Sequence, residues 1–257
     1  MKRKRIGTAV LVIGTVLGLT ACSPTQTTLP QGNEQATLDP AKFSTQIDNP
    51  YWPMKPGTRW TFRETDASGK VFTVVVVVTD RTKTIANGVK ARVVRDTAYR
   101  GKEIVEDTFD WYAQDSYGAI WYLGEDTAEF KHGKIVSRAG SFEAGVRGAQ
   151  AGVLLPGQPR VGLAYREEYL RGEAEDNGKI LSLHEQADTR YKHFTNMLLI
   201  KDTSTIEPDV VEYKFYARGF GAVLTIDISG GSGREELINV DTAPAGAGTG
   251  PLGHPNS

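Results

Sequence analysis

Apolar and polar residues alternate along much of the chain with a period of two. Within residues 58–65, for example, Trp60 and Phe62 fall on one side and the residues between them are polar. A period of two places successive side chains on opposite faces of an extended strand, whereas an amphipathic helix needs a period near 3.6. No window of useful length beyond the first 21 residues has the helical period. The pattern therefore predicts strands.

Further segments are rich in β-branched residues and end at turn residues, such as Asn87-Gly88, a strong hairpin signal. Residues 71–79 are apolar on both faces, which predicts a central strand covered on both sides. Many short strands at regular spacing predict an all-β fold, an antiparallel meander that forms an open barrel or a sandwich. The other predicted strands cover residues 89–98, 103–114, 119–127, 134–138, 163–174, 179–187, 196–202, 210–217, 222–228 and 234–240.

The ends of the chain have a different composition from the predicted domain, which spans residues 43–242. Residues 22–42 are rich in Thr, Gln, Pro and Gly, and predict a flexible linker. Residues 243–257 are mostly Gly, Ala and Pro, and predict a disordered tail. Residues 139–162 have many glycines and little periodicity, and predict a long loop within the domain.

The first 21 residues have the plan of a secretory signal peptide. Four cations at residues 2–5 precede an apolar stretch at residues 6–19, which is shorter than the roughly 20 residues of a membrane span. Leu19-Thr20-Ala21-Cys22 follows and resembles the bacterial lipobox. The resemblance implies cleavage before Cys22, a diacylglyceryl group on its thiol and usually a further acyl chain such as palmitate on its amino group. The alternatives are an ordinary signal peptide with an accidental cysteine, and a retained helix.

The charge and cysteine count restrict the remaining chemistry. The chain has a net charge of −1, and residues 1–21 hold four cations and no acid, which leaves −5 after cleavage. A mildly acidic surface argues against nucleic acid as a partner. Cys22 is the single cysteine, so that no disulfide or catalytic thiolate is expected after lipidation. The expected partner is a membrane, reached through the lipid on Cys22 from the extracytoplasmic side of a bacterial envelope.

Two stretches are similar to known sequences. Residues 51–60, YWPMKPGTRW, resemble the opening of many exported bacterial β-domains. Residues 106–126, which contain EDTFDWYAQD and IWYLGED, together with YREEY at residues 165–169, resemble a family of uncharacterised bacterial lipoproteins and secreted proteins. The resemblance covers most of residues 48–237. It implies an envelope location and a β fold, and it carries over no activity and no functional residue.

No catalytic residue and no cofactor is predicted. His132, His184, His193 and His254 lack the spacing of a metalloenzyme or structural zinc motif. Ser232 lies in a glycine-rich stretch that lacks the final glycine of the serine-hydrolase elbow. Nucleotide-binding glycine motifs are also missing from the sequence.

The predicted hairpin at residues 103–127 carries the candidate ligand-binding residues Trp111, Tyr112, Trp121 and Tyr122. If residues 115–118 form a four-residue turn, Trp111 lies opposite Tyr122 and Tyr112 lies opposite Trp121. Such aromatic residues serve most often as core and cross-strand pairs. The alternative is an apolar cavity or groove that holds one small ligand.

The same register places Asp107 opposite Asp126. Opposed like charges destabilise a sheet, and a bound cation, a basic neighbour, exposure to solvent or a different register would relieve them. Asp107 and Asp126 are therefore the candidate metal ligands, although they do not fit the EF-hand pattern. Two carboxylates on adjacent strands are also the arrangement of a glycosidase.

These observations predict a membrane-anchored, non-enzymatic binding domain for a lipophilic ligand or an envelope protein. The alternative is an envelope glycan hydrolase with paired carboxylates. A cavity lined by apolar side chains would favour the first function, and a cleft with two carboxylates about 5–10 Å apart would favour the second.

Overall fold

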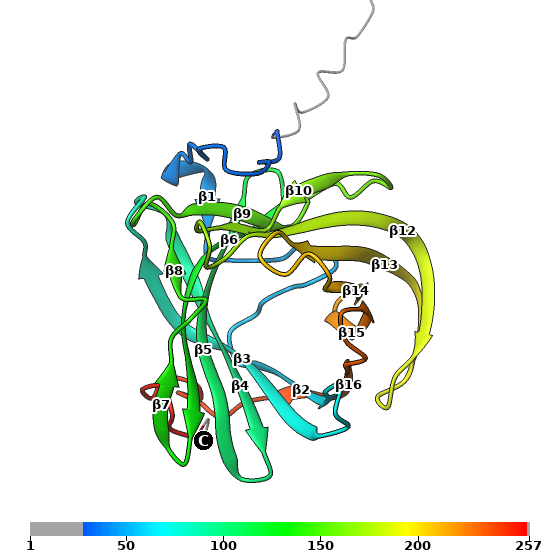
Figure 1. Ribbon diagram of the computed structural model, residues 1–257. Coiled ribbons are helices and arrows are strands. Elements are labelled where there is room, and N and C mark those ends of the chain that lie inside the picture. The colour runs from blue at the N-terminus through cyan, green and yellow to red at the C-terminus, as the bar shows by residue number, and fades with distance from the viewer. Residues whose placement is uncertain (1–27, 256–257) are drawn as a thin grey trace, which may run out of the picture.

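The computed structural model describes residues 28–255 and shows the predicted all-β architecture (Figure 1). One antiparallel sheet curls into a nearly closed barrel. Its single short 3₁₀ turn, η1 (Pro40–Lys42), begins where the Asp39 side chain caps Ala41 N. Within this part of the chain no helix is long and apolar enough to cross a membrane. The predicted signal peptide and Cys22 lie outside the described residues.

Most strands pair with their neighbours in sequence, as a meander requires. The sheet has the order β10-β12-β13-β14-β15-β16-β2-β3-β4-β5-β6-β9-β11, and β1 pairs with β5 while β7 and β8 pair with β6. The bounds are β1 (Phe43–Ser44), β2 (Thr58–Thr65), β3 (Val71–Thr84), β4 (Lys90–Arg100), β5 (Glu103–Asp115), β6 (Ile120–Lys131), β7 (Lys134–Ser137), β8 (Phe142–Glu143), β9 (Gln150–Leu155), β10 (Ala164–Arg166), β11 (Glu168–Tyr169), β12 (Asp176–Asp188), β13 (His193–Ser204), β14 (Val211–Ala217), β15 (Gly221–Ser229) and β16 (Arg234–Thr242).

The chain itself joins the two edges of the sheet. Edge strands β10 and β11 are separated by one residue, Glu167, whose N–H donates to Asp176 O. Gly152 and Gly178 lie beside this seam. A Cβ at Gly152 would lie 2.2 Å from the Glu167 carbonyl, and one at Gly178 would lie 2.5 Å from the Glu167 carboxylate. Glycine is required at both positions because backbone and side chains approach so closely there.

Residues 139–162 are not the predicted loop. They contain β8 and β9, and both pair with β6. Cross-strand pairing forms these short strands, and alternation within such short segments is too weak to predict them. The other predicted strands are present, although residues 163–174 hold only the short β10 and β11.

The segment at residues 28–42 packs on the barrel, which corrects the predicted flexible linker. Arg166 holds it: its N–H donates to Pro30 O at 2.8 Å, and its guanidinium donates to Gly32 O at 2.8 Å and Glu34 O at 2.7 Å. Leu29 is buried as part of the hydrophobic core. Composition alone cannot show this, because the partner lies more than 130 residues away.

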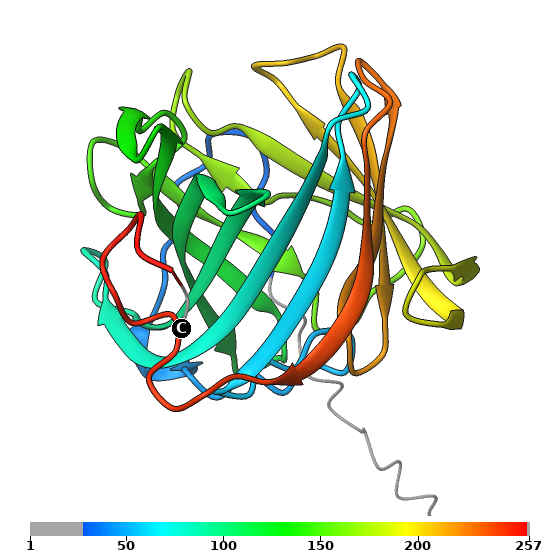
Figure 2. The ribbon, with the colours of Figure 1, turned by 90° about the horizontal axis from the view of Figure 1, so that it is seen from below.

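The segment at residues 243–255 also packs on the barrel, which corrects the predicted disordered tail. It follows the outside of the sheet beside β3 and β4 (Figure 2). Ala243 and Ala247 bury Val77 of β3, and Ala243 N donates to Gly57 O. The two-sided burial predicted for residues 71–79 thus holds from Val74 to Thr79, with the barrel interior on one face and this segment on the other.

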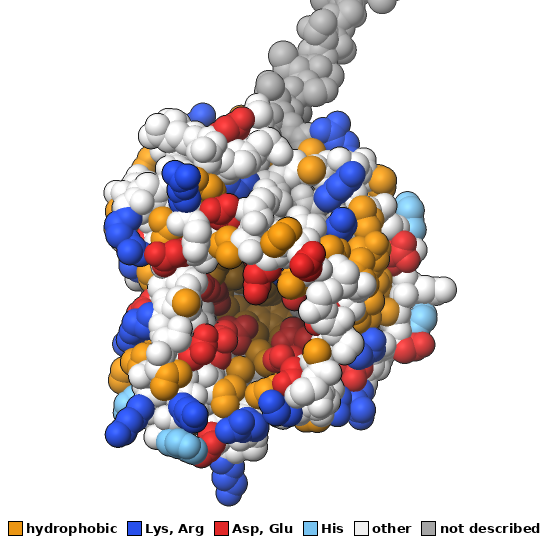
Figure 3. All heavy atoms as spheres, in the orientation of Figure 1, with side chains coloured by type: hydrophobic (Ala, Val, Ile, Leu, Met, Phe, Trp, Pro, Cys, Tyr) orange, Lys and Arg blue, Asp and Glu red, His pale blue; other side chains and the backbone are white. Residues whose placement is uncertain are grey.

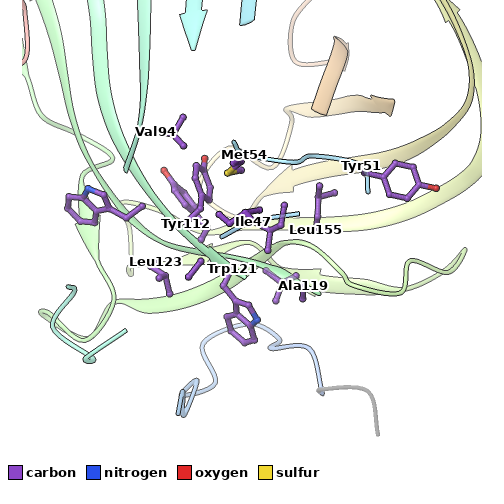
Figure 4. Close-up of a cluster of buried hydrophobic side chains, with 14 of the residues drawn as sticks. Ile47, Tyr51, Met54, Val94, Tyr112, Ala119, Trp121, Leu123 and Leu155 are labelled. Carbon is purple, nitrogen blue, oxygen red and sulfur yellow. The ribbon is translucent and has the colours of Figure 1, made fainter. Parts of the chain in front are cut away.

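The interior of the barrel is closed on one side by residues 45–57, which connect β1 and β2. Ile47 and Met54 are buried and joined by a hydrogen bond from Met54 N to Ile47 O. Figure 4 shows them beside Tyr112 of β5 and Leu155 of β9, while Trp121 points away from them. This packing leaves the rest of the interior for the site described next.

Candidate functional site

The open part of the barrel interior is a cavity with acidic walls. Figure 3 shows Asp and Glu side chains around a hollow whose floor is hydrophobic. Strand register places the inward-facing carboxylates, here called the inner carboxylates, on the same face of the sheet as Trp60. They are Glu64 on β2, Asp96 on β4, Glu106 and Asp110 on β5, Glu125 on β6, Asp202 on β13, Glu212 on β14 and Glu235 on β16.

Two pockets that share Glu212 lie along the acidic wall, and Gly140 in the lining of one of them is next to the Glu125 carboxylate. The larger has a volume of about 500 Å³ and is lined by Glu168, Asp176 and Asp202, among others. The smaller has a volume of about 370 Å³ and includes Glu64, Lys214 and Glu235 in its lining. Each volume lies within the range that accommodates a small ligand.

Asp110 and Glu125 form the most closely coupled pair in the wall. They are cross-strand partners on β5 and β6, and both lie within hydrogen-bonding distance of the Tyr122 hydroxyl, at 2.8 Å and 2.7 Å. The two bonded carboxylate oxygens therefore lie within about 5.5 Å of each other. A phenol carries one hydrogen, so that it can donate to only one of the two carboxyl groups. The other group must carry a proton to complete the arrangement.

The pKa values agree with a shared proton. Burial, opposed by the Tyr122 hydrogen bond, raises the pKa of Asp110 to about 7. Burial together with the Asp110 charge raises the pKa of Glu125 to about 8. Burial raises the pKa of Glu235 to about 7 and that of Asp96 well above its usual value. The neighbouring carboxylates add to each of these shifts, because like charges disfavour ionisation.

Lys214 is the basic group on the inner wall near Asp202 and Glu212. Its Nζ lies 2.7 Å from Asp202 Oδ2 and 3.6 Å from Glu212 Oε2. Lys214 Nζ and Asp202 Oδ2 therefore form an ion pair. The other carboxylate oxygen, Asp202 Oδ1, has no hydrogen-bond partner in the described structure. Burial, together with the charges of Glu212 and Asp176, raises the pKa of Asp202 in spite of Lys214. One cation therefore faces several acids.

Aromatic side chains form the floor. Trp52, from the segment that closes the barrel, contacts Trp60, Tyr112 and Tyr216 with ring centroids 6.3, 5.9 and 6.2 Å away. Tyr112 stacks on Tyr122 at 5.0 Å with an interplanar angle of 22°. Rings from β2, β5, β6 and β14 thus meet beneath the acidic wall.

The predicted aromatic residues divide between the two faces of the sheet. Tyr112 and Tyr122 face the cavity, as a ligand-binding role would require. Trp111 lies on the outer face under Lys83, whose Nζ is 3.5 Å from the ring centroid. Trp121 is also on the outer face, where it packs on Phe43 at 5.9 Å and is covered by the N-terminal segment. Neither tryptophan faces the interior of the barrel.

The predicted register of the hairpin is wrong by one residue at the turn, where Gln114 lies opposite Ile120 and not Ala119, and by one more residue at a β-bulge. Tyr112 lies opposite Tyr122, and a register shift between Asp110 and Tyr112 then places Asp107 opposite Ala128. Asp107 pairs with Arg95, and Asp126 pairs with Arg138 at 2.6 Å, so that each carboxylate has a basic neighbour. The candidate metal pair is therefore not formed. Among residues 28–255 no three His, Asp or Glu side chains converge to hold a metal ion.

Sequence reasoning missed the inner carboxylates. The available signal is the alternation Glu106, Thr108, Asp110, Tyr112 on one face of β5. An acidic and aromatic stripe on one face is what the inside of a ligand-binding barrel requires, but the same stripe would also suit a face exposed to solvent. Only the closure of the sheet decides between them.

Comparisons with known proteins give matches among solved structures. No protein-family model matches the chain, and no curated protein matches it. One similar solved structure is a Bacteroides fragilis NCTC 9343 protein whose name describes it as exported, with a YmcC-like fold; the TM-score is 0.45 and the identity 12%, over 73% of this chain and 97% of that one. Another, named as a lipoprotein, is from Parabacteroides distasonis ATCC 8503, with a TM-score of 0.42 and 13% identity over 76% of this chain and 100% of that one.

Proposed function

We propose that this chain is a lipoprotein of the bacterial envelope whose barrel binds a small amphiphilic molecule without transforming it. The observation that carries the proposal is the open cavity, which combines an aromatic floor with polar walls. Such a combination suits a ligand that is part apolar and part polar, since apolar surface supplies affinity and a few polar groups supply orientation. The predicted lipophilic ligand is compatible with the floor but not with the walls.

The lipobox at residues 19–22 supports the membrane attachment. Because residues 28–42 pack on the barrel, only residues 23–27 would separate lipidated Cys22 from the folded part. The six Cα-to-Cα steps from Cys22 to Thr28 span at most about 22 Å when fully extended. The anchor would thus hold the side of the barrel that carries residues 28–42 close to the membrane, where an amphiphilic molecule would be available.

The direct test is recovery of a bound molecule. The full-length protein, isolated from its own envelope, should release a small molecule that mass spectrometry detects. Thr225→Trp should abolish recovery of the molecule, because Thr225 of β15 lines the cavity and an indole would fill the space. Val161→Trp, at an exposed position, is the matched control and should retain the molecule. An empty wild-type protein that also fails to bind a neutral naphthylamine reporter would overturn the proposal.

The second candidate is hydrolysis of envelope glycans, and the Asp110–Glu125 pair is the observation in its favour. Two carboxyl groups of raised pKa, close together, resemble the acid and the nucleophile of a retaining glycosidase. Against it, the Tyr122 hydroxyl occupies the position between them, where the scissile bond would have to lie. Binding is therefore the better-supported function. Release of reducing sugar from purified envelope glycans, lost in Asp110→Asn, would favour the hydrolase.

A further inference from the structure

We propose that the ligand of this cavity is an organic cation, held with its positive group against Asp110 and Glu125 and its apolar part over the stacked Tyr112 and Tyr122 rings. This inference rests on the proposed binding function and specifies the chemical class of the ligand. On binding, the cation would displace the proton that the two carboxyl groups share. The affinity should therefore increase with pH.

The first argument is the geometry of the pair. The Tyr122 hydroxyl bonds both carboxyl groups, and its single hydrogen satisfies one of them. Both carboxyl groups can bond the Tyr122 hydroxyl only if one of them carries a proton. That proton adds one positive charge to the pair. A ligand cation that reaches the pair can supply that charge instead, and both groups can then ionise. The proton has only bulk water to go to, so binding should release it into solution.

The second argument is the lack of a protein cation at this position. The groups that face the pair are Asp96 on β4, Glu106 on β5, Glu168 on β11 and Asp176 on β12, with Tyr112 beside them and Lys214 and Glu235 farther along the wall. The charged groups with the largest effects on the pKa values of Asp110 and Glu125 are all acidic. Buried carboxylates in folded proteins are normally paired, and these have no basic partner among the described residues.

A separate observation in the same wall is an oxygen without a partner. Asp202 is 6% exposed and lines the cavity together with Glu168 and Asp176. Its Oδ1 has no hydrogen-bond partner in the described part of the chain, whereas Oδ2 lies 2.7 Å from Lys214 Nζ. An unsatisfied buried acceptor is costly, and a donor group on a ligand would satisfy it. Ammonium groups donate and do not accept, which matches a wall of acceptors.

The aromatic floor distinguishes an organic cation from a metal ion. Ring faces attract ammonium groups by cation–π interaction and also pack against apolar carbon. The Tyr122 hydroxyl bonds Asp110, Tyr112 stacks on Tyr122, and Trp52 contacts Tyr112, so that an aromatic cluster adjoins the carboxyl pair. A metal ion would instead need three or more converging ligands, which the described residues do not provide. The combination of rings and dispersed carboxylates fits an amine or quaternary ammonium that carries an apolar group.

The test compares two probes of similar size. Benzyltrimethylammonium keeps its charge at every pH, whereas benzyl alcohol is neutral. The full-length protein is reconstituted in phosphatidylcholine nanodiscs, and binding is measured by calorimetry against empty nanodiscs at pH 5.5 and pH 8.5. We expect the cation to bind roughly 10- to 100-fold more tightly than the alcohol at pH 8.5, because the ionised carboxylates and the ring faces both attract a positive charge. At pH 5.5 this preference should shrink at least several-fold, and titrations in two buffers should show proton release.

The matched variants locate the effect. Asp110→Asn combined with Glu125→Gln should reduce the affinity for the cation to that for the alcohol and leave alcohol binding unchanged, which also shows that the variant is folded. Asp126→Asn is the control, because Asp126 neighbours Glu125 in sequence but lies on the outer face with Arg138. Equal affinity for the two probes, or a cation affinity independent of pH, would overturn the inference while the proposed function stands. Failure of both probes to bind would overturn both.

Discussion

Arg95 and Asp107 form an ion pair with two hydrogen bonds, and neither side chain is accessible to solvent. Arg95 Nε and Nη2 donate to Asp107 Oδ1 and Oδ2 at 2.9 and 2.5 Å. The same guanidinium donates to the carbonyls of Gly250, Pro251 and His254, and Gly253 N donates to Asp107 Oδ2. The buried pair of Arg95 and Asp107 thus attaches the C-terminal segment to the barrel, a role that the composition of the chain does not indicate.

The first prediction concerns this pair. Arg95→Ala leaves the Asp107 carboxylate buried without its partner, and the free energy of unfolding should fall by about 3–5 kcal/mol. Thermal denaturation should show a melting temperature about 10 °C lower. Arg138→Ala, which removes the exposed partner of Asp126, should change the stability by less than about 1 kcal/mol. Similar effects in both variants would contradict the role of the buried pair.

The second prediction concerns the C-terminal segment itself. Truncation after Thr242 removes the residues that bury Val77 and satisfy Arg95. We expect a loss of roughly 2 kcal/mol or more, since apolar area is exposed and several hydrogen bonds are broken. Hydrogen exchange should report the same contacts as slow amides in the intact chain, most clearly at Ala243 and Gly253. A truncated protein as stable as the full chain would show that the segment contributes nothing.

The third prediction is a fall in stability between pH 5 and pH 8.5. The pKa values of Asp110 and Glu125 rise from 3.8 and 4.5 to about 7 and 8 in the folded protein, mainly through burial. The folded state therefore holds a proton that the unfolded chain has released, and the stabilisation present at low pH is lost as the pH rises through the folded values. The slope should approach about 1.4 kcal/mol per pH unit for each proton.

Urea denaturation at several pH values measures this slope. Asp110→Asn with Glu125→Gln should flatten it, whereas Asp126→Asn should leave it unchanged. Glu235, whose pKa is about 7 and is raised by burial, contributes in the same direction and should maintain a residual slope. Stability that increases with pH over this range would contradict the assignment of the shared proton.

The fourth prediction concerns the anchor. Cys22→Ala should abolish lipidation and leave uncleaved or mis-sorted precursor, because the lipid is attached to the cysteine thiol. Mass spectrometry of the N-terminal peptide from wild-type protein is the measurement. Detection of mature protein with an unmodified Cys22 would end the lipoprotein interpretation.

Several features of this protein follow from local sequence. Strands β2, β4 and β14 lie close to where period-two alternation and turn residues predict them, because side-chain direction in a strand depends on position alone. The antiparallel meander follows from the short connections between the strands. The net charge and the number of cysteines also follow from the sequence without a structure.

The tertiary structure decided the rest. A one-residue difference at the turn and the bulge between Asp110 and Tyr112 together shift the register by two residues and replace the predicted Asp107–Asp126 pair by the Asp110–Glu125 pair. Each shift is a single residue, because pairing depends on both strands and on the turn between them. Contacts over more than 130 residues also attach the two end segments, whose compositions indicate disorder. Whether an acidic stripe faces solvent or a cavity depends on the closure of the sheet at Glu167, which no local pattern contains.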